Sequence, residues 1–375
     1  MMKNKIQHLL AAGLVYCCLA ATLTACSNVV ETDDGYVSQH LVANSGAPVI
    51  KAVYALTDAD QRTPLTEAQP GQRVCIVGEN LNNLQSLTFN TVAADLSQTY
   101  TALTKAVVKI PQEYSKGHDN TIVYTTDQGT VSFPFCVALP EATVGGLLNE
   151  FAKAGSTVAI DGQNLQYYDF TLTLNGTALP LTVTANSLSF AIPAGTPDNS
   201  TFVIGWQTVK GVAQSRELPF RPTSGMLIND ITQATNSMTD KSVAVEIDGD
   251  GTPCLHFTGA IREWSWVELS YENMTAQSID EADVDQYRFV FEVKTAAGKP
   301  LADTGYEFAW NGNWNNSIRW NPGAGYDTQG EWHTVRLPMV AFSATGGKVV
   351  LNVGFQPATN YEADFRLANF RIEKQ

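Results

Sequence analysis

A short segment occurs twice in the chain, and this internal duplication constrains the fold more than any other feature of the sequence. Residues 70–81, PGQRVCIVGENL, align with residues 154–165, AGSTVAIDGQNL, at an offset of 84. A second pair, VVKIP at 107–111 and LSFAIP at 188–193, repeats at an offset of 82. A fixed period of this size indicates two consecutive domains of roughly 85–95 residues each.

Both copies carry the pattern of short β-strands. RVCIVG and TVAIDG are runs of β-branched residues closed by glycine, and DFTLTLNG alternates apolar and polar residues. We expect Gly78 and Gly162 to occupy a sharp turn or a positive φ angle. Short strands at regular spacing predict a β-sandwich. The block resembles the IPT/TIG immunoglobulin-like family, whose early pattern G-x-x-V-x-I-x-G-x-N-L both copies match. The resemblance implies a spacer or scaffold.

The pattern changes near Pro222, where RPTSGMLIND leads into a further domain. Segments such as YRFVFEVKT, YEFAWNG and KVVLNVGFQ predict around eight strands without a long helix, which suggests a jelly-roll sandwich. The predicted fold class is therefore all-β: two immunoglobulin-like (IPT/TIG) β-sandwiches, at 47–138 and 139–222, followed by a jelly-roll-like β-sandwich at 223–375.

The N-terminus predicts a targeting segment. Lys3 and Lys5 precede an apolar stretch from Leu9 to Leu23, as in a secretory signal peptide that we place at 1–25. The sequence LTAC that ends at Cys26 resembles the bacterial lipobox. This resemblance implies that Cys26 is lipidated and tethers the protein to a membrane.

Residues 26–46 predict a flexible acidic stalk. Ser27 follows the cysteine where aspartate is the usual signal for retention in the inner membrane, so we expect the outer membrane. Acidic residues after Ser27 resemble the tracts of lipoproteins exported to the cell surface, and they favour a location facing the cell exterior. These residues are Glu31, Asp33 and Asp34.

Charge and cysteine content exclude several classes of function. The formal net charge is −14, and an acidic surface repels phosphate backbones, so nucleic acid is not an expected partner. After the predicted lipid anchor, Cys75, Cys136 and Cys254 remain, with no short spacing typical of a zinc site. The sequence allows either a disulfide between Cys75 and Cys136 or two buried free thiols at these positions. We expect no metal and no cofactor.

Six of the seven tryptophans lie in the C-terminal domain, and FAWNGNWNNSIRWNPG at 308–323 holds three of them beside five asparagines. Either the indoles fill a core and the asparagines make turns, or both face a ligand with apolar faces and hydroxylated edges, such as a sugar ring. Trp332, entering an alternating strand, is expected to be structural. Trp310 shares its parity with Tyr306 and Phe308 and could continue a core stripe. Trp314 and Trp320 are expected in an open loop.

Trp264 and Trp266 would share one face of a regular strand, either core or binding surface. The asparagines have a second interpretation as turn residues. The candidate glycan-contacting residues are Trp264, Trp266, Trp310, Trp314, Trp320, Asn311, Asn313, Asn315 and Arg319.

The order of these features resembles one known group. A lipobox, an acidic stalk, tandem IPT-like domains and a Trp-rich terminal domain with segments such as GAIREWSWVELSY and FRLANFRIE are similar to surface glycan-binding proteins of Bacteroidota polysaccharide-utilisation systems. The terminal domain looks like the xyloglucan-binding type. The resemblance implies capture of a polysaccharide, with a β-glucan such as xyloglucan favoured, and transfer to surface glycoside hydrolases and a SusC/SusD-type importer.

An enzyme is not expected. A glycoside hydrolase needs two carboxylates across a cleft, and Glu307, Asp327 and Glu331 near the tryptophans are scattered along the chain. The main hypothesis is therefore non-catalytic binding of a polysaccharide. The alternatives are an adhesion or cell-envelope scaffold whose tryptophans are all core and, less favoured, a glycoside hydrolase.

Overall fold

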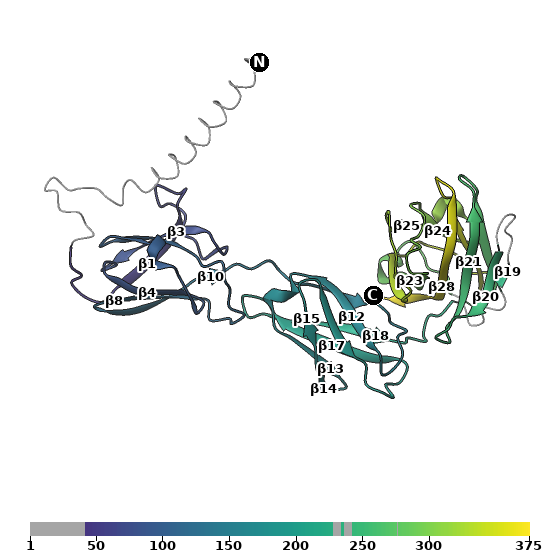
Figure 1. The fold of residues 1–375 in the computed structure, drawn as a ribbon, viewed down its shortest axis with the longest axis horizontal. Coiled ribbons are helices and arrows are strands. Elements are labelled where there is room, and N and C mark those ends of the chain that lie inside the picture. Colours follow the sequence, from purple (N-terminus) through teal and green to yellow (C-terminus); the bar gives the residue numbers. More distant parts are fainter. Residues whose placement is uncertain (1–41, 228–233, 236–241, 276) are drawn as a thin grey trace, which may run out of the picture. The chain divides into compact units, whose positions relative to one another are not determined.

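The structure is a computed structural model that describes residues 42–227, 234–235, 242–275 and 277–375 (Figure 1). The predicted signal peptide, Cys26 and residues 26–41 of the predicted stalk lie outside these residues. Within the described part of the chain, no helix has the length and apolar character to cross a membrane. The strands confirm the prediction of an all-β fold.

The described residues divide into two compact units. One comprises the described residues up to Thr143 with Gln163–Thr171 and Gly205–Ser215, and the other comprises Val144–Gly162, Leu172–Ile204 and Arg216–Gln375. The predicted boundaries between domains at 138 and 222 remain predictions.

The first repeat copy forms two four-stranded sheets and a small parallel pair. Buried residues such as Val74, Ile76 and Tyr124 form its core. The sheet orders are β1(Val49–Ala55)–β3(Arg73–Glu79)–β7(Lys105–Lys109)–β6(Tyr100–Thr101), β5(Val92–Ala93)–β4(Leu84–Phe89)–β8(Thr121–Thr126)–β9(Gly129–Pro134), and β10(Cys136–Val137)–β2(Glu67–Ala68).

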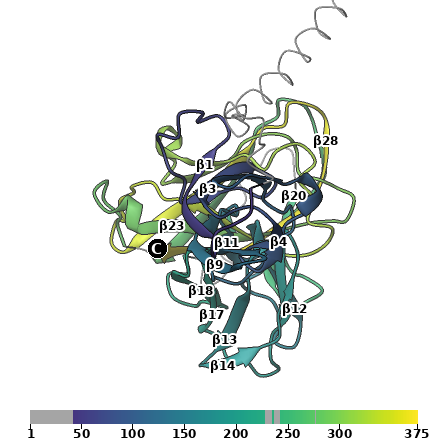
Figure 2. The ribbon, with the colours of Figure 1, turned by 90° about the vertical axis from the view of Figure 1, so that its left-hand side faces the viewer.

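The second copy forms two more four-stranded sheets. The strands β14, β13, β17 and β18 form one layer that can be followed in both views (Figures 1 and 2). The sheet orders are β11(Thr143–Leu147)–β12(Thr157–Gln163)–β16(Ser187–Ala191)–β15(Thr182–Val183) and β14(Thr177–Leu179)–β13(Phe170–Leu174)–β17(Ser200–Gln207)–β18(Ala213–Phe220).

The duplication extends to backbone geometry. Strands β3 and β12 begin and end at the offset of 84 residues found in the sequence. Asn80 and Asn164, one residue after each strand, are left-handed with φ of 57° and 59°. The prediction of a sharp turn or a positive φ at Gly78 and Gly162 was wrong, because both lie within strands and neither has a positive φ. A Cβ on Gly78 would lie 1.8 Å from the carbonyl oxygen of Val49, so this glycine permits close approach of strand β1.

The C-terminal domain packs two five-stranded sheets face to face. Inward residues of both sheets, including Phe289, Phe308 and Phe365, form one aromatic core. The sheet orders are β19(Ala234–Thr235)–β22(Val267–Thr275)–β27(Lys348–Phe355)–β24(Tyr306–Trp310)–β25(Ile318–Trp320) and β20(Ser242–Ile247)–β21(Pro253–Ile261)–β28(Tyr361–Lys374)–β23(Tyr287–Thr295)–β26(His333–Pro338). Short 3₁₀ turns complete the chain at η3(Leu96–Gln98), η4(Leu165–Tyr167), η6(Val284–Gln286) and η7(Trp314–Asn316).

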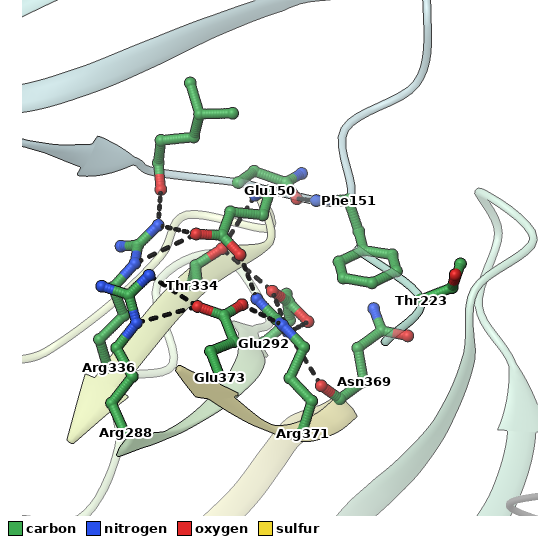
Figure 3. A network of polar contacts seen from close by, with 12 residues as sticks. Glu150, Phe151, Thr223, Arg288, Glu292, Thr334, Arg336, Asn369, Arg371 and Glu373 are labelled. Carbon is green, nitrogen blue, oxygen red and sulfur yellow. Dashed lines mark hydrogen bonds and ion pairs between the residues drawn. The ribbon is translucent and has the colours of Figure 1, made fainter. Parts of the chain in front are cut away.

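The outer face of the sheet containing β23 and β28 carries a buried ion network (Figure 3). Glu292 and Arg371 are both fully buried, and the guanidinium donates to both carboxylate oxygens at 3.0 and 3.1 Å. Glu150, which follows β11, is equally buried and pairs with Arg371 and Arg336. The Thr334 hydroxyl accepts from the Glu150 backbone N–H at 2.9 Å. The segment around Glu150 therefore docks on the C-terminal domain.

Burial sets the protonation of this network. Removal from water, with the Glu150 carboxylate adding to it, raises the pKa of Glu292 to about 7 despite the pull of Arg371. Glu373 bonds Arg371 and Arg288, and these arginines hold its pKa below the ordinary value against the effect of its own burial. Three arginines and three glutamates thus form one network, in which Arg371, Glu150 and Glu292 are cut off from water.

All three cysteines of the described chain are buried, and no disulfide joins them. Burial raises the pKa of Cys254 to about 12 and also raises that of Cys136, so these thiols stay protonated and unreactive. Of the two alternatives left open by the sequence, buried thiols are correct.

Candidate functional site

Three of the tryptophans belong to the core. Trp310 is 2% exposed, Trp320 8% and Trp332 5%. On β24, Trp310 continues the inward stripe of Tyr306 and Phe308, which was one of its two interpretations. The expectation of an open loop was wrong for Trp320. It ends the short strand β25, where it pairs opposite Tyr306 and packs with its ring 5.4 Å from that of Phe291.

The other tryptophans of the domain are accessible, and two of them, Trp266 and Trp314, lie over the outer face of the sheet β19–β22–β27–β24–β25. Trp264 is 65% exposed, Trp266 is 42% exposed, and Trp314 is half-buried. The rings of Trp266 and Trp314 meet edge to face, with centroids 5.1 Å apart and planes at 83°. Trp264 and Trp266 do not share a strand face, because they lie in the connection between β21 and β22.

A glycine forms the floor beneath this pair. A Cβ on Gly354 would lie 2.4 Å from Cζ2 of Trp266 and 2.9 Å from Cη2 of Trp314. Such distances are well inside van der Waals contact, so both indoles rest on the bare backbone of β27. Sequence reasoning missed Gly354, since VVLNVGFQ contains no signal that two remote tryptophans fold over its glycine.

Trp264 has an unusual backbone. Its φ is 60°, in the left-handed region that bulky residues rarely adopt. Its N–H donates to the Pro357 carbonyl at 2.8 Å, and the Gln356 side-chain amide donates to its carbonyl. A conformation of this kind costs about 1–3 kcal/mol and persists where the surroundings hold it. At Trp264 this backbone conformation holds a large indole ring in solvent, and packing of the core does not account for that position.

Charged groups flank the indoles on the neighbouring strands. Backbone pairing places Gly354 opposite Glu307 and Glu307 opposite Arg319. The Arg319 guanidinium lies 3.9 Å from the Glu307 carboxylate and is 62% exposed, while the Ser317 hydroxyl donates to Glu307 at 3.3 Å. Exposed donors and acceptors beside aromatic rings can bond the hydroxyl groups of a ligand.

The asparagines divide between turn and surface positions. Asn311 is left-handed, its amide donates to the Ser343 carbonyl, and its side-chain oxygen accepts from the Val350 N–H, each at 2.9 Å. Its side chain therefore serves the turn. Asn313 and Asn315 are exposed on either side of Trp314.

One of the acidic residues near the tryptophans, Asp327, is held by hydrogen bonds from its own loop and from residues at and after the end of β23. The Asp327 carboxylate accepts from the Thr295 hydroxyl at 2.6 Å and from the N–H groups of Gly298 and Gln329. These hydrogen bonds, the one from Thr295 first, hold its pKa below the ordinary value. Asp327 thus has a structural role in its loop. Within the described ranges, no group of three or more potential metal ligands occurs.

Residues 225–374 match the family model described as the surface glycan-binding protein B xyloglucan binding domain. The match spans the C-terminal domain. The resemblance inferred from the sequence is thereby confirmed for the domain that carries the exposed tryptophans.

A solved structure of a similar protein supports the fold. A surface glycan-binding protein, PbSGBP-B from Prevotella bryantii, has a TM-score of 0.60 at 18% identity, over 88% of this chain and 99% of that chain. A second one, from a complex xyloglucan utilization locus of Bacteroides uniformis, has a TM-score of 0.42 at 17% identity, over 88% of this chain and 100% of that chain. No curated protein matches the chain.

Proposed function

We propose that this protein captures a polysaccharide at the cell surface without cleaving it, and that Trp264, Trp266 and Trp314 are the platforms that contact the sugar rings. The observation that supports this proposal is the aromatic cluster over Gly354, which a packed core does not require. It lies in a domain whose family is described as xyloglucan-binding. A β-glucan, xyloglucan first, is therefore the proposed ligand.

The energetics are adequate for this role. One indole that covers about 100 Å² of apolar sugar surface contributes roughly 2.5 kcal/mol at about 25 cal/mol/Å². Micromolar affinity corresponds to about 8 kcal/mol, so three platforms with hydrogen bonds from groups such as Arg319 reach it. The buried Trp310 and Trp320 and the turn residue Asn311 are not part of the proposed contact surface.

The proposal extends to the cellular setting. The lipid on Cys26 would hold the protein at the outer membrane facing the exterior, with the stalk and the two immunoglobulin-like sandwiches as spacers. The captured chain would pass to surface glycoside hydrolases and a SusC/SusD-type importer. The alternative is an adhesion or envelope scaffold, for which the exposed indoles would contact a protein partner.

Affinity electrophoresis tests the proposal. The protein is run through gels that each contain one polysaccharide: xyloglucan, mixed-linkage glucan, β-1,3-glucan, mannan, xylan, pectin or an α-glucan. We expect retardation by xyloglucan, and its loss in Trp266→Ala and Trp314→Ala. Tyr100→Ala is the control, since Tyr100 is also 65% exposed but lies in the first sandwich. Retardation by none of these glycans, or retardation that survives both substitutions, contradicts it. Release of oligosaccharides would indicate an enzyme.

A further inference from the structure

The turn that carries Trp264 contains a residue that its backbone geometry disfavours. The Ser265 N–H donates to the Arg262 carbonyl at 3.2 Å, which closes a four-residue turn between β21 and β22 with Trp264 at its third position. The φ of Trp264 is 60°, whereas that of Glu263 before it is not positive. Turns with a positive φ only at the third position normally have glycine or asparagine there. A tryptophan persists at this position because the surrounding structure holds the turn.

The connection between β27 and β28 holds this turn by three hydrogen bonds. The Trp264 N–H donates to the Pro357 carbonyl at 2.8 Å, and the side-chain amide of Gln356 donates to the Trp264 carbonyl. The Glu263 N–H donates to the side-chain oxygen of Asn360 at 3.1 Å. We call Gln356, Pro357 and Asn360 the clamp. Because the clamp bonds both backbone groups of Trp264, it fixes the peptide planes on either side of this residue.

The clamp is itself anchored to the sandwich. The Thr304 hydroxyl donates to the Gln356 carbonyl at 2.6 Å, and Pro357 is buried. The residue Gln356 is nevertheless exposed, so water could satisfy its side-chain amide equally well. The hydrogen bond from this amide to the turn is therefore not needed to satisfy a buried polar group, and it serves to hold the turn.

The same end of β27 supports all three proposed platforms. Gly354 lies beneath the rings of Trp266 and Trp314, and Gln356, two residues further along, bonds the backbone of Trp264. The Trp264 residue is 65% exposed, so its ring has little packing to hold it in place. An indole that the backbone already fixes loses less conformational entropy when a ligand binds, and this strengthens binding.

We propose that Gln356 is a positioning residue for glycan binding, because its amide holds Trp264 in the left-handed conformation that presents the indole to the ligand. This inference rests on the proposed function, since Trp264 must be one of the platforms. Gln356 acts through the turn and does not contact the sugar. When its hydrogen bond is lost, only a fraction of the molecules presents the ring, and the apparent Kd rises by the inverse of that fraction.

Substitution of Gln356 in two backgrounds tests the inference. Calorimetry of the purified protein with a xylogluco-oligosaccharide should show that Gln356→Ala raises Kd about fivefold, as loss of one hydrogen bond would. Gln356→Glu keeps the shape of the side chain but has no N–H to donate, so it should raise Kd by at least as much. In Trp264→Ala, which removes the ring itself, adding Gln356→Ala should change Kd no further.

Hydrogen exchange of the unliganded protein gives a second readout. Loss of the clamp bond should make the backbone amides of residues 262–266 exchange faster in Gln356→Ala than in the unsubstituted protein. Thr359→Ala is the matched control, because Thr359 is exposed on the same connection and takes no part in the three hydrogen bonds. It should leave both Kd and exchange unchanged.

Two results would overturn the positioning role. One is an unchanged Kd in Gln356→Ala while Trp264→Ala weakens binding. The other is a loss that persists in the Trp264→Ala background, which would mean that Gln356 contacts the sugar directly. Failure of the proposed platform is distinct: Trp264→Ala alone would then bind as the unsubstituted protein does, and the role of the clamp in binding would fail with it.

Discussion

Replacing Gly354 with alanine is expected to weaken glycan binding while leaving the fold intact. The new Cβ would lie 2.4 Å from Trp266 and 2.9 Å from Trp314, and ordinary contact between carbon atoms is about 3.5–4.0 Å. Both ring edges must therefore withdraw by about 1 Å. Gly354 has no positive φ, and alanine is favoured over glycine in a strand by about 0.5–1 kcal/mol, so the backbone accepts the change.

The loss of affinity follows from the displacement. Two indoles contribute about 5 kcal/mol if each covers roughly 100 Å² of sugar. A gap of about 0.5–1 Å forfeits a quarter to a half of the contact energy. We therefore expect Gly354→Ala to lose about 1–2.5 kcal/mol of binding free energy, or roughly 5- to 70-fold in Kd.

Three measurements check this prediction. Calorimetry with a xylogluco-oligosaccharide gives the change in Kd, near-UV circular dichroism reports the geometry of the indole pair, and urea titration gives the free energy of unfolding. Gly249→Ala is the control, because a Cβ there meets no atom within 4 Å and its φ is not positive. An altered dichroism signal with unchanged Kd would refute the role of the pair in binding. An unchanged signal would refute the packing argument itself.

Further substitutions separate binding from stability. Trp320→Ala, which truncates a core residue, should cost about 3–5 kcal/mol in unfolding free energy, whereas Trp314→Ala should cost little and abolish retardation in xyloglucan gels. Glu150→Gln should lower stability by about 1–3 kcal/mol in urea titrations, since it weakens charged hydrogen bonds to Arg371 and Arg336 while Glu292 and Glu373 still pair with Arg371. Because the pKa of Glu292 rises from 4.5 unfolded to about 7 folded, its protonated form stabilises the fold below pH 4.5. That contribution, about 3 kcal/mol, is lost as pH rises through 7. In urea titrations between pH 4.5 and 7, the unfolding free energy of the unsubstituted protein should therefore fall with pH, and that of Glu292→Gln should not show this fall.

Local patterns in the sequence predicted the sandwiches because most of the strands are long enough to show an alternation of apolar and polar residues. The stripe of Tyr306, Phe308 and Trp310 has three members on one strand, and its burial follows from period two. Strand β25 contains only Ile318–Trp320, after a turn rich in asparagine. Three residues are too few to show the apolar–polar alternation that would place Trp320 in a core. The asparagine-rich composition of the segment therefore suggested a loop.

The candidate site depends on the pairing of strands that are far apart in the sequence, and no local sequence pattern reveals this pairing. Trp266 and Trp314 are neighbours because β22, β27 and β24 are adjacent in one sheet with a particular register. The left-handed backbone of Trp264 is equally invisible, since nothing about tryptophan favours it. The turn role of Asn311, in contrast, was one of the two interpretations that asparagine chemistry offered.

The support of two indoles by one glycine has a consequence for how such a domain diversifies. Trp266 and Trp314 belong to separate connections, and both rest on backbone, not on the side chains that fill the core. Either connection can therefore change length or composition without repacking the sandwich. During evolution, substitutions in these two short connections can change the sugar preference of the domain, while the need to fold constrains the residues of the core.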